Sequence, residues 1–351
     1  MTNGRGLSAM PGIWHARRAG RALAGAIRRR SPHGVVLLYH RVAGPRRDPQ
    51  WLDVSPKHFD AQLDVIVRSA TPLTLDEFES RRRAGRLPRR AVAVTFDDGY
   101  ADNLHAAAPA LARHGIAATV FITAGMIGSR REFWWDEIER IAFAPELPAA
   151  AVPGTGIRWS AADAAPPPPD SADDTWTMLR ADDPTPRHRL YRALASALRR
   201  LSTPLREARL AEWRAWATVP TDGRPSHRAL TVEELRTLAA LHGISIGAHT
   251  LTHPSLAAIA ADEQAGEIAG SRAWLEQVLG TPVRSFAYPF GTPDDVSSAT
   301  VRAASAACDY AMSTSPGVAW RWSSRWRIPR TIVRDWDADA FASRLDAMFE
   351  A

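Results

Sequence analysis

The stretch Ala91-Val92-Ala93-Val94-Thr95-Phe96 runs without interruption into Asp97-Asp98-Gly99. A continuous apolar run that ends in turn residues predicts a strand buried on both faces, as in a parallel sheet. A helical stretch follows through Ala112, His114-Gly115 ends it, and the next apolar run covers residues 117–123. Strand, helix and strand at this spacing predict a βαβ unit with a right-handed crossover.

Similar strand and helix patterns occur on both sides of this unit. Further strands are expected at residues 35–39, 244–248, 283–288 and 327–333. Helices are expected to begin at Ser55-Pro56 and at Thr74, and to cover residues 231–243, 262–279 and 296–307. Thr231 and Glu234 form a Thr-x-x-Glu capping box at the start of one of them. The alternation predicts an α/β fold with a parallel sheet.

The alternation breaks in one long segment, which we expect to be an insertion at about 136–228. Residues 145–186 are rich in Ala, Pro, Asp and Gly, a composition typical of loop or disorder. Residues 187–217 have leucines at helical spacing. The predicted organisation is therefore a basic N-terminal arm, residues 1–30, followed by one domain over residues 31–345 that the insertion interrupts.

Composition and charge narrow the class of protein. The 351 residues are 45% hydrophobic and 23% charged with a formal net charge of +6, which excludes a mostly disordered or fibrous chain. The single cysteine, Cys308, excludes an intramolecular disulfide. Basic residues are scattered among acidic ones outside two local clusters, so we expect no nucleic-acid partner.

The N-terminal arm lacks the features of an export signal. Residues 13–30 interleave arginine with Ala, Leu and Ile, whereas a signal peptide needs ~7–15 consecutive apolar residues. No apolar run in the chain approaches the ~20 residues of a membrane-spanning helix. The prediction is a cytoplasmic protein whose arm makes at most a weak contact with an anionic membrane surface.

Polar residues follow several of the predicted strands. Asp97 and Asp98 end one strand, and His249 and His253 follow another. The carboxyl ends of parallel strands meet at one edge of a sheet, so these side chains are expected to converge there. Two imidazoles and one carboxylate suit a divalent metal such as Zn²⁺ with an open position for water. Taken singly, Asp-Asp-Gly also suits a plain turn, and His-x3-His also suits an exposed histidine pair.

Three motifs together resemble a known family. They are Thr95-Phe96-Asp97-Asp98-Gly99, His249-Thr250-x-x-His253 and Phe286-Ala287-Tyr288-Pro289-Phe290-Gly291. In this order and spacing they are similar to the polysaccharide deacetylases with a NodB-homology domain, carbohydrate esterase family 4. The resemblance covers roughly residues 33–135 and 229–335. It implies a distorted (β/α)-barrel and metal-dependent removal of acetyl groups from an N-acetylated sugar.

The resemblance also implies roles for individual residues. Asp97 matches the catalytic base, and Asp98, His249 and His253 match the metal ligands. The metal, usually Zn²⁺ in this family, would activate water and polarise the acetyl carbonyl. The backbone N–H of Phe290 would help to hold the oxyanion.

Two departures from the family pattern stand out. Many members have an arginine just before the prolines of the third motif, where this chain has Ala287. Arg330 or Arg284 is then expected to supply the guanidinium, with Arg330 preferred. Many members also have a C-terminal Leu-x-His that supplies the general acid, but no histidine follows His253 in this chain. Leu38-Tyr39-His40 resembles that element in a circularly permuted subset, which makes His40 the candidate acid.

Two tyrosines next to the motifs are further candidates for contact with the substrate. Tyr288 lies within the third motif and Tyr100 follows Asp-Asp-Gly. The expected substrate is an N-acetylated sugar or glycan precursor, whose identity and length the sequence does not specify. Two alternatives remain: a non-catalytic carbohydrate-binding protein on the same barrel, and a C–N amidase that acts on a small non-sugar amide.

Overall fold

The computed structural model describes residues 31–44, 47–160, 162–163 and 175–350. The N-terminal arm, with its predicted membrane contact, lies outside the described residues, as does the proline-rich stretch 164–174. Within the described ranges, none of the helices combines the length and apolar character that crossing a bilayer requires. The cytoplasmic location stays a prediction.

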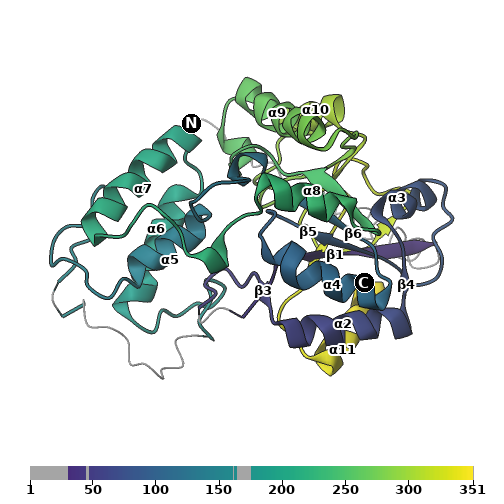
Figure 1. Ribbon diagram of the computed structural model, residues 1–351, viewed down its shortest axis with the longest axis horizontal. Helices are drawn as coiled ribbons and strands as arrows, with labels where there is room; N and C mark the ends of the chain where they lie inside the picture. Colours follow the sequence, from purple (N-terminus) through teal and green to yellow (C-terminus); the bar gives the residue numbers. More distant parts are fainter. Residues whose placement is uncertain (1–30, 45–46, 161, 164–174, 351) are drawn as a thin grey trace, which may run out of the picture.

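A largely parallel sheet forms the centre of the fold (Figure 1). Its strand order is β10-β1-β5-β6-β7-β8-β9, with β4 beside β5 and β11 beside β1. The strands are β1 (His33–Tyr39), β4 (Thr71–Pro72), β5 (Ala91–Phe96), β6 (Ala118–Ile122), β7 (Ile244–Ala248), β8 (Ser285–Ala287), β9 (Tyr310–Met312), β10 (Ala319–Trp320) and β11 (Thr331–Ile332). A separate pair joins β2 (Arg41–Val42) to β3 (Asp53–Val54). All pairings except that of β10 with β1 are parallel.

The sheet curls until its two ends approach each other. An isolated parallel bridge joins Met312 of β9 to Ile328, and β11, three residues further on, pairs with β1. The segment from Ile328 to Ile332 therefore connects the last strand back to the first. The predicted strand over residues 327–333 is correspondingly too long, because Pro329 has no N–H to continue a ladder.

Helices connect the strands and cover the sheet. They are α2 (Pro56–Ser69), α3 (Leu75–Arg83), α4 (Ala108–His114), α8 (Val232–Ala240), α9 (Ala261–Leu279), α10 (Ser298–Ala307) and α11 (Ala338–Glu350). The predicted capping box of Thr231 and Glu234 is confirmed at the start of α8. A π-helical turn, Asn103–Ala107, leads into α4, which ends at left-handed Gly115.

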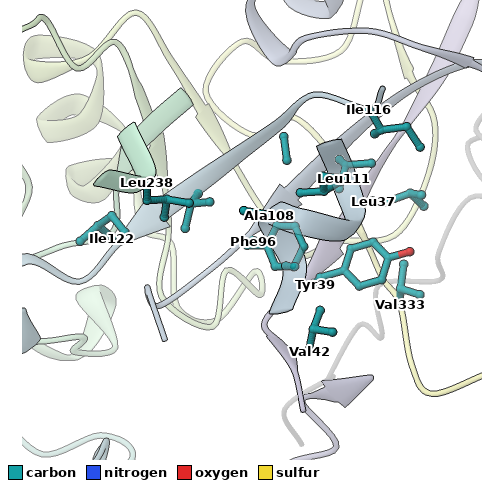
Figure 2. Packing of buried hydrophobic residues seen from close by; sticks show 14 of the residues in the cluster. Leu37, Tyr39, Val42, Phe96, Ala108, Leu111, Ile116, Ile122, Leu238 and Val333 are labelled. Carbon is teal, nitrogen blue, oxygen red and sulfur yellow. The ribbon is translucent and has the colours of Figure 1, made fainter. Parts of the chain in front are cut away.

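The main core lies between this sheet and its helices. Leu37 and Tyr39 of β1, Phe96 of β5 and Leu111 of α4 are buried side by side in it (Figure 2). Every residue of β5 is buried, as the unbroken apolar run predicts for a strand covered on both faces. This packing fixes the strand ends from which the polar residues project.

The segment at 136–228 contains helices with a core of their own. The helices α5 (Trp134–Ala142), α6 (Pro186–Leu198) and α7 (Thr203–Ala217) lie to one side of the sheet (Figure 1). Leu190, Leu194 and Trp213 are fully buried in a cluster with residues of α5. The predicted helical stretch 187–217 is thus two helices separated by residues 199–202, and the leucine spacing marks their buried faces.

Candidate functional site

The polar residues of the first two motifs meet at the carboxyl edge of the sheet. Asp97 and Asp98 follow β5, and His249 follows β7, on either side of β6. The Nε2 atoms of His249 and His253 lie 3.5 and 3.4 Å from Asp98 Oδ1. Asp98, His249 and His253 are buried, and their ligand atoms all lie within 4.8 Å of one another.

The hydrogen bonds around these three side chains fit a metal ion. His249 Nδ1 lies 2.8 Å from the carbonyl oxygen of Ala287, which only accepts, so Nδ1 carries the proton and Nε2 has its lone pair free. Asp98 Oδ1 and His253 Nδ1 are buried without a hydrogen-bond partner among the described residues. A buried carboxylate without partners is costly, and a cation held by two imidazoles and this oxygen relieves that cost.

Burial shapes the protonation of these three side chains. It raises the pKa of the Asp98 carboxyl well above the usual range, and the neighbouring Asp97 charge adds to this rise. Burial lowers the pKa of both histidines, and for His253 the positive charge of a protonated His249 lowers it further. Neutral imidazoles are the form that binds a metal.

Several residues of the site adopt left-handed backbone conformations. The φ angles are 76° at Asp98, 68° at Thr250, 55° at His253 and 58° at Phe290. Such angles are uncommon for residues other than glycine and persist where the surrounding structure holds them. Four in one site indicate that the loops are held in place to orient these side chains.

Arg330 holds the other aspartate. Its Nη1 and Nη2 atoms each lie 2.7 Å from one carboxylate oxygen of Asp97, and both side chains are buried. Arg330 Nε also donates to the Ser313 carbonyl at 3.0 Å. Burial alone would raise the pKa of the Asp97 carboxyl, but the charge and hydrogen bonds of Arg330 outweigh it and hold the pKa below its usual value. Asp97 is therefore an anion at neutral pH.

The alternative arginine lies elsewhere. Arg284 precedes β8, and its exposed side chain lies 3.3 Å from Asp309 at the opposite edge of the sheet. Arg330 reaches Asp97 because it belongs to the segment that connects β9 to β1. Of the two arginines considered from the sequence, only Arg330 contacts Asp97.

His40 lies at the end of β1, at the same edge of the sheet. Its side chain is half-buried, and its Nδ1 atom has no hydrogen-bond partner within the described ranges. Burial lowers the pKa of the imidazole to about 3, although the Asp97 charge opposes this. The imidazole is therefore neutral at neutral pH in the free protein.

The third motif contributes Phe290. Its ring packs edge-on against His253, with 4.9 Å between the ring centroids. No described residue accepts a hydrogen bond from its backbone N–H. The N–H of Tyr288, in contrast, donates to Met312 in the sheet at 3.1 Å. Among the described residues, the backbone N–H of Phe290 is thus an unpaired donor of this motif.

The two tyrosines predicted to contact the substrate are both fully buried. The Tyr100 hydroxyl donates to Asp136 at 2.6 Å and accepts from Trp135 Nε1 at 2.7 Å. The Tyr288 hydroxyl donates to the Trp326 carbonyl at 2.9 Å. This prediction is corrected, because neither side chain has exposed surface for a substrate and both hydroxyls already have partners.

Two residues that support the second motif were missed from the sequence. Glu267 of α9 accepts hydrogen bonds from the backbone N–H groups of Leu251 and Thr252 at 2.8 and 2.9 Å. Arg206 of α7 donates to carbonyls of the same loop. No local pattern marks either residue, because each is an ordinary charged residue on an amphipathic helix.

Comparison with known proteins identifies the family. The sequence model described as polysaccharide deacetylase matches residues 84–146 and 217–313. This chain belongs to the polysaccharide deacetylase family. Both matched stretches contain the motifs that form the site, and the residues between them, 147–216, belong to the segment with α6 and α7.

A curated relative agrees with this membership. YxkH of Bacillus subtilis (strain 168), assigned by name to the polysaccharide deacetylases, is 28% identical over 109 residues. That alignment covers 30% of this chain and only 38% of the relative's length.

Two solved structures share the fold over nearly the whole chain. The deacetylase PplD of Streptococcus pyogenes, solved with acetate, has a TM-score of 0.56 at 17% identity, covering 92% of this chain and 100% of PplD. IcaB from Ammonifex degensii has a TM-score of 0.55 at 18% identity, covering 91% of this chain and 98% of IcaB. The predicted fold, a distorted (β/α)-barrel of the NodB type, is confirmed.

Proposed function

We propose that this protein is a metal-dependent hydrolase that removes acetyl groups from the nitrogen of an N-acetylated sugar. The observation that carries the proposal is the meeting of two groups at one edge of the sheet. One is the ligand set of Asp98, His249 and His253, and the other is the buried pair of Asp97 and Arg330. The family membership and the solved relative with bound acetate support the same reaction.

The ligand set suits Zn²⁺, because two imidazoles and one carboxylate leave a coordination position open. When bound, such an ion acts as a Lewis acid toward the acetyl carbonyl and lowers the pKa of water toward ~7. The His249 tautomer that the Ala287 carbonyl fixes keeps Nε2 ready for the ion. His253 Nε2 and Asp98 Oδ1, which lie 3.4 Å apart, complete the set.

Asp97 is the proposed general base. Its carboxylate is ionised, and Arg330 fixes both oxygens in one orientation while leaving further lone pairs to accept a proton from the attacking water. Its Oδ2 lies 3.9 Å from His249 Nε2, so the base faces the ligand set. Arg330 orients the base and does not itself take part in proton transfer, since a guanidinium stays protonated.

Two further groups complete the proposed reaction. The spare N–H of Phe290 donates to the oxygen of the tetrahedral intermediate, which develops negative charge as water adds to the carbonyl. His40 gives a proton to the leaving nitrogen, because an amine departs poorly as an anion. The imidazole is neutral in the free protein, so this role requires it to gain a proton once the substrate is bound. His40 directly follows the first strand, β1, and the permuted subset that this position suggested from the sequence stays a prediction.

An acetate-release assay tests the proposed function. The purified protein, stripped of metal and then given Zn²⁺, is incubated with a panel of N-acetylated glycans and with small non-sugar acetamides. The expected result is zinc-dependent release of acetate from at least one glycan. Release only from the non-sugar amides would favour the amidase alternative. Glycan binding without any release would favour a non-catalytic carbohydrate-binding protein.

A further inference from the structure

The loop that contains both histidine ligands has its backbone groups almost fully hydrogen-bonded. The carbonyls of Thr250 and Leu251 accept from Ala124 and Gly125 at 3.0 and 2.8 Å. Glu267 accepts from the N–H groups of Leu251 and Thr252. These partners all belong to the barrel. None of the described barrel residues donates to the last two carbonyls of the loop, those of Thr252 and His253.

Both remaining carbonyls bind one side chain from the inserted segment. Arg206 of α7 donates from Nη2 to the Thr252 oxygen at 2.5 Å and from Nη1 to the His253 oxygen at 3.2 Å. No other described group donates to these two oxygens. Buried carbonyls need partners, so the loop conformation depends on this guanidinium.

His253 is the residue of this loop that most needs to be held. Its φ of 55° is left-handed, and it precedes Pro254, a position that favours extended conformations. A ligand in a strained backbone conformation stays there only where neighbouring groups fix it. Arg206 binds the carbonyl that precedes His253 and the carbonyl of His253 itself. Both peptide groups that flank the His253 α-carbon are therefore held, and with them the direction of the imidazole.

Arg206 is itself buried and well anchored. Its exposed fraction is 2%, and α7 is attached to the rest of the molecule by ion pairs of Glu207 with Arg131 and of Arg214 with Glu137. Thr203 Oγ1, one turn earlier in α7, lies 2.6 Å from Thr252 Oγ1. Arg206 lies outside both stretches that match the family model.

We propose that Arg206 is a positioning residue for the metal centre, which makes helix α7 part of the apparatus that holds His253 as a ligand. This inference rests on the metal site of the proposed function. It assigns the inserted segment a role in metal binding, beyond covering one side of the barrel. Loss of Arg206 leaves two buried carbonyls unpaired and allows His253 to relax out of the ligand set.

The test is the metal affinity of Arg206→Met, which keeps most of the volume but has no donors. Zn²⁺ affinity of the metal-free full chain is measured by competition with a chromophoric chelator, and the visible spectrum of the Co²⁺-loaded protein reports ligand geometry. We expect Zn²⁺ to bind about 10- to 100-fold more weakly and the Co²⁺ spectrum to change. Arg206→Lys donates from one nitrogen, so its Zn²⁺ affinity should lie between those of Arg206→Met and wild type. If Arg206→Met does not fold, the comparison of Arg206→Lys with wild type carries the test.

Arg187 provides a matched control on α6. It is equally buried, and its Nη1 donates to the carbonyls of Ala142 and Ala144 at 3.0 and 2.6 Å, within the inserted segment. Arg187→Met should lower thermal stability by a similar amount and leave Zn²⁺ affinity within about twofold of wild type.

Two results would overturn the inference while the proposed function stands. One is an Arg206→Met variant that binds Zn²⁺ as tightly as wild type, and the other is an equal loss in Arg187→Met. A wild-type chain that binds neither Zn²⁺ nor Co²⁺ would instead remove the metal centre, and this inference with it.

Discussion

Arg330 and Asp97 are 233 positions apart in the chain, yet the two Nη atoms of the arginine bind the two carboxylate oxygens of the aspartate at 2.7 Å each. Both side chains are buried, so the pair has almost no contact with water. Paired hydrogen bonds of this kind fix a carboxylate in one plane. The orientation of the proposed base is therefore set by the segment that connects the last strand of the sheet to the first.

Arg330→Met should destabilise the fold strongly. Removing one partner of a buried ion pair leaves an unpaired charge, so we expect the free energy of unfolding at neutral pH to fall by about 3–5 kcal/mol. Urea denaturation measures this loss. In a double-mutant cycle with Asp97→Asn, the double variant should lose less than the sum of the single variants. Arg284→Met is the control, and additive losses in the cycle would show that the pair does not act as a unit.

Metal content should depend on the two histidines. His249→Ala and His253→Ala each remove one of three ligands, so elemental analysis of the purified variants should find the divalent metal lost. His227→Ala is a suitable control, because His227 is buried outside the ligand set, with its Nδ1 atom 2.9 Å from Ser226 Oγ. Full metal occupancy in both ligand variants would show that the ion lies elsewhere.

Asp97→Asn should keep the metal and lose most of the activity. The amide has nearly the same shape but does not accept the proton of the attacking water, and base catalysis contributes typically ~10²–10⁴-fold. Acetate release at saturating Zn²⁺, with metal content measured on the same sample, separates the two effects. Activity within a few-fold of wild type would remove Asp97 from the mechanism.

His40→Ala should distinguish amide from ester substrates. Cleavage of an amide needs a proton on the leaving nitrogen, whereas an acetyl ester with a good leaving group does not. We expect normal metal binding, slow release of acetate from N-acetyl substrates and a smaller loss on the activated ester. Equal losses on both substrates would point to a positioning role, and full amide activity would end the proposal that His40 is the general acid.

Glu234 gives a pH-dependent contribution to stability at the start of α8. Its hydrogen bonds with Arg228, with the Thr231 N–H and with His105 lower the pKa of its carboxyl to about 2. A lowered folded-state pKa means that the contribution is complete above the unfolded value near 4.5 and is lost as pH falls toward 2.

Glu234→Gln should therefore cost at most about 1 kcal/mol at pH 7, the range for a partly exposed ion pair, and the difference from wild type should shrink between pH 4.5 and 2. Urea denaturation across this range measures the effect. The exposed neighbour Glu233 serves as the control, because Glu233→Gln removes a charge of the same helix turn without removing an ion pair. A penalty for Glu234→Gln that stays constant with pH would contradict the assignment.

Much of the site follows from local sequence alone. The unbroken apolar run of β5 ends at Asp97-Asp98, and a strand covered on both faces must release its polar residues at its end. The same reasoning places His249 at the end of β7. Because parallel strands end at a common edge, the convergence of Asp98, His249 and His253 was predictable without a structure. The choice of Asp98 over Asp97 as the proposed ligand came from the resemblance to the family.

Other features depend on how distant segments pack. The choice between Arg330 and Arg284 follows from the closure of the sheet through the Met312–Ile328 bridge, which no local pattern reveals. The burial of Tyr100 and Tyr288 likewise depends on residues from distant parts of the chain that cover them. Their neighbours in the sequence, the motif residues, suggest contact with substrate instead.

The sequence by itself determined the α/β class, the ends of the strands that precede Asp97 and His249, and the residue types of the proposed metal site, because hydrophobic periodicity and residue type are local properties. Only the tertiary structure decided which arginine orients Asp97 and which helix supports His253. Those choices rest on contacts between Arg330 and Asp97, and between Arg206 and the loop of residues 249–253. Contacts between residues so far apart in the chain form only when the sheet curls and helix α7 packs beside it. Their partners are therefore set by three-dimensional packing and not by chain neighbours.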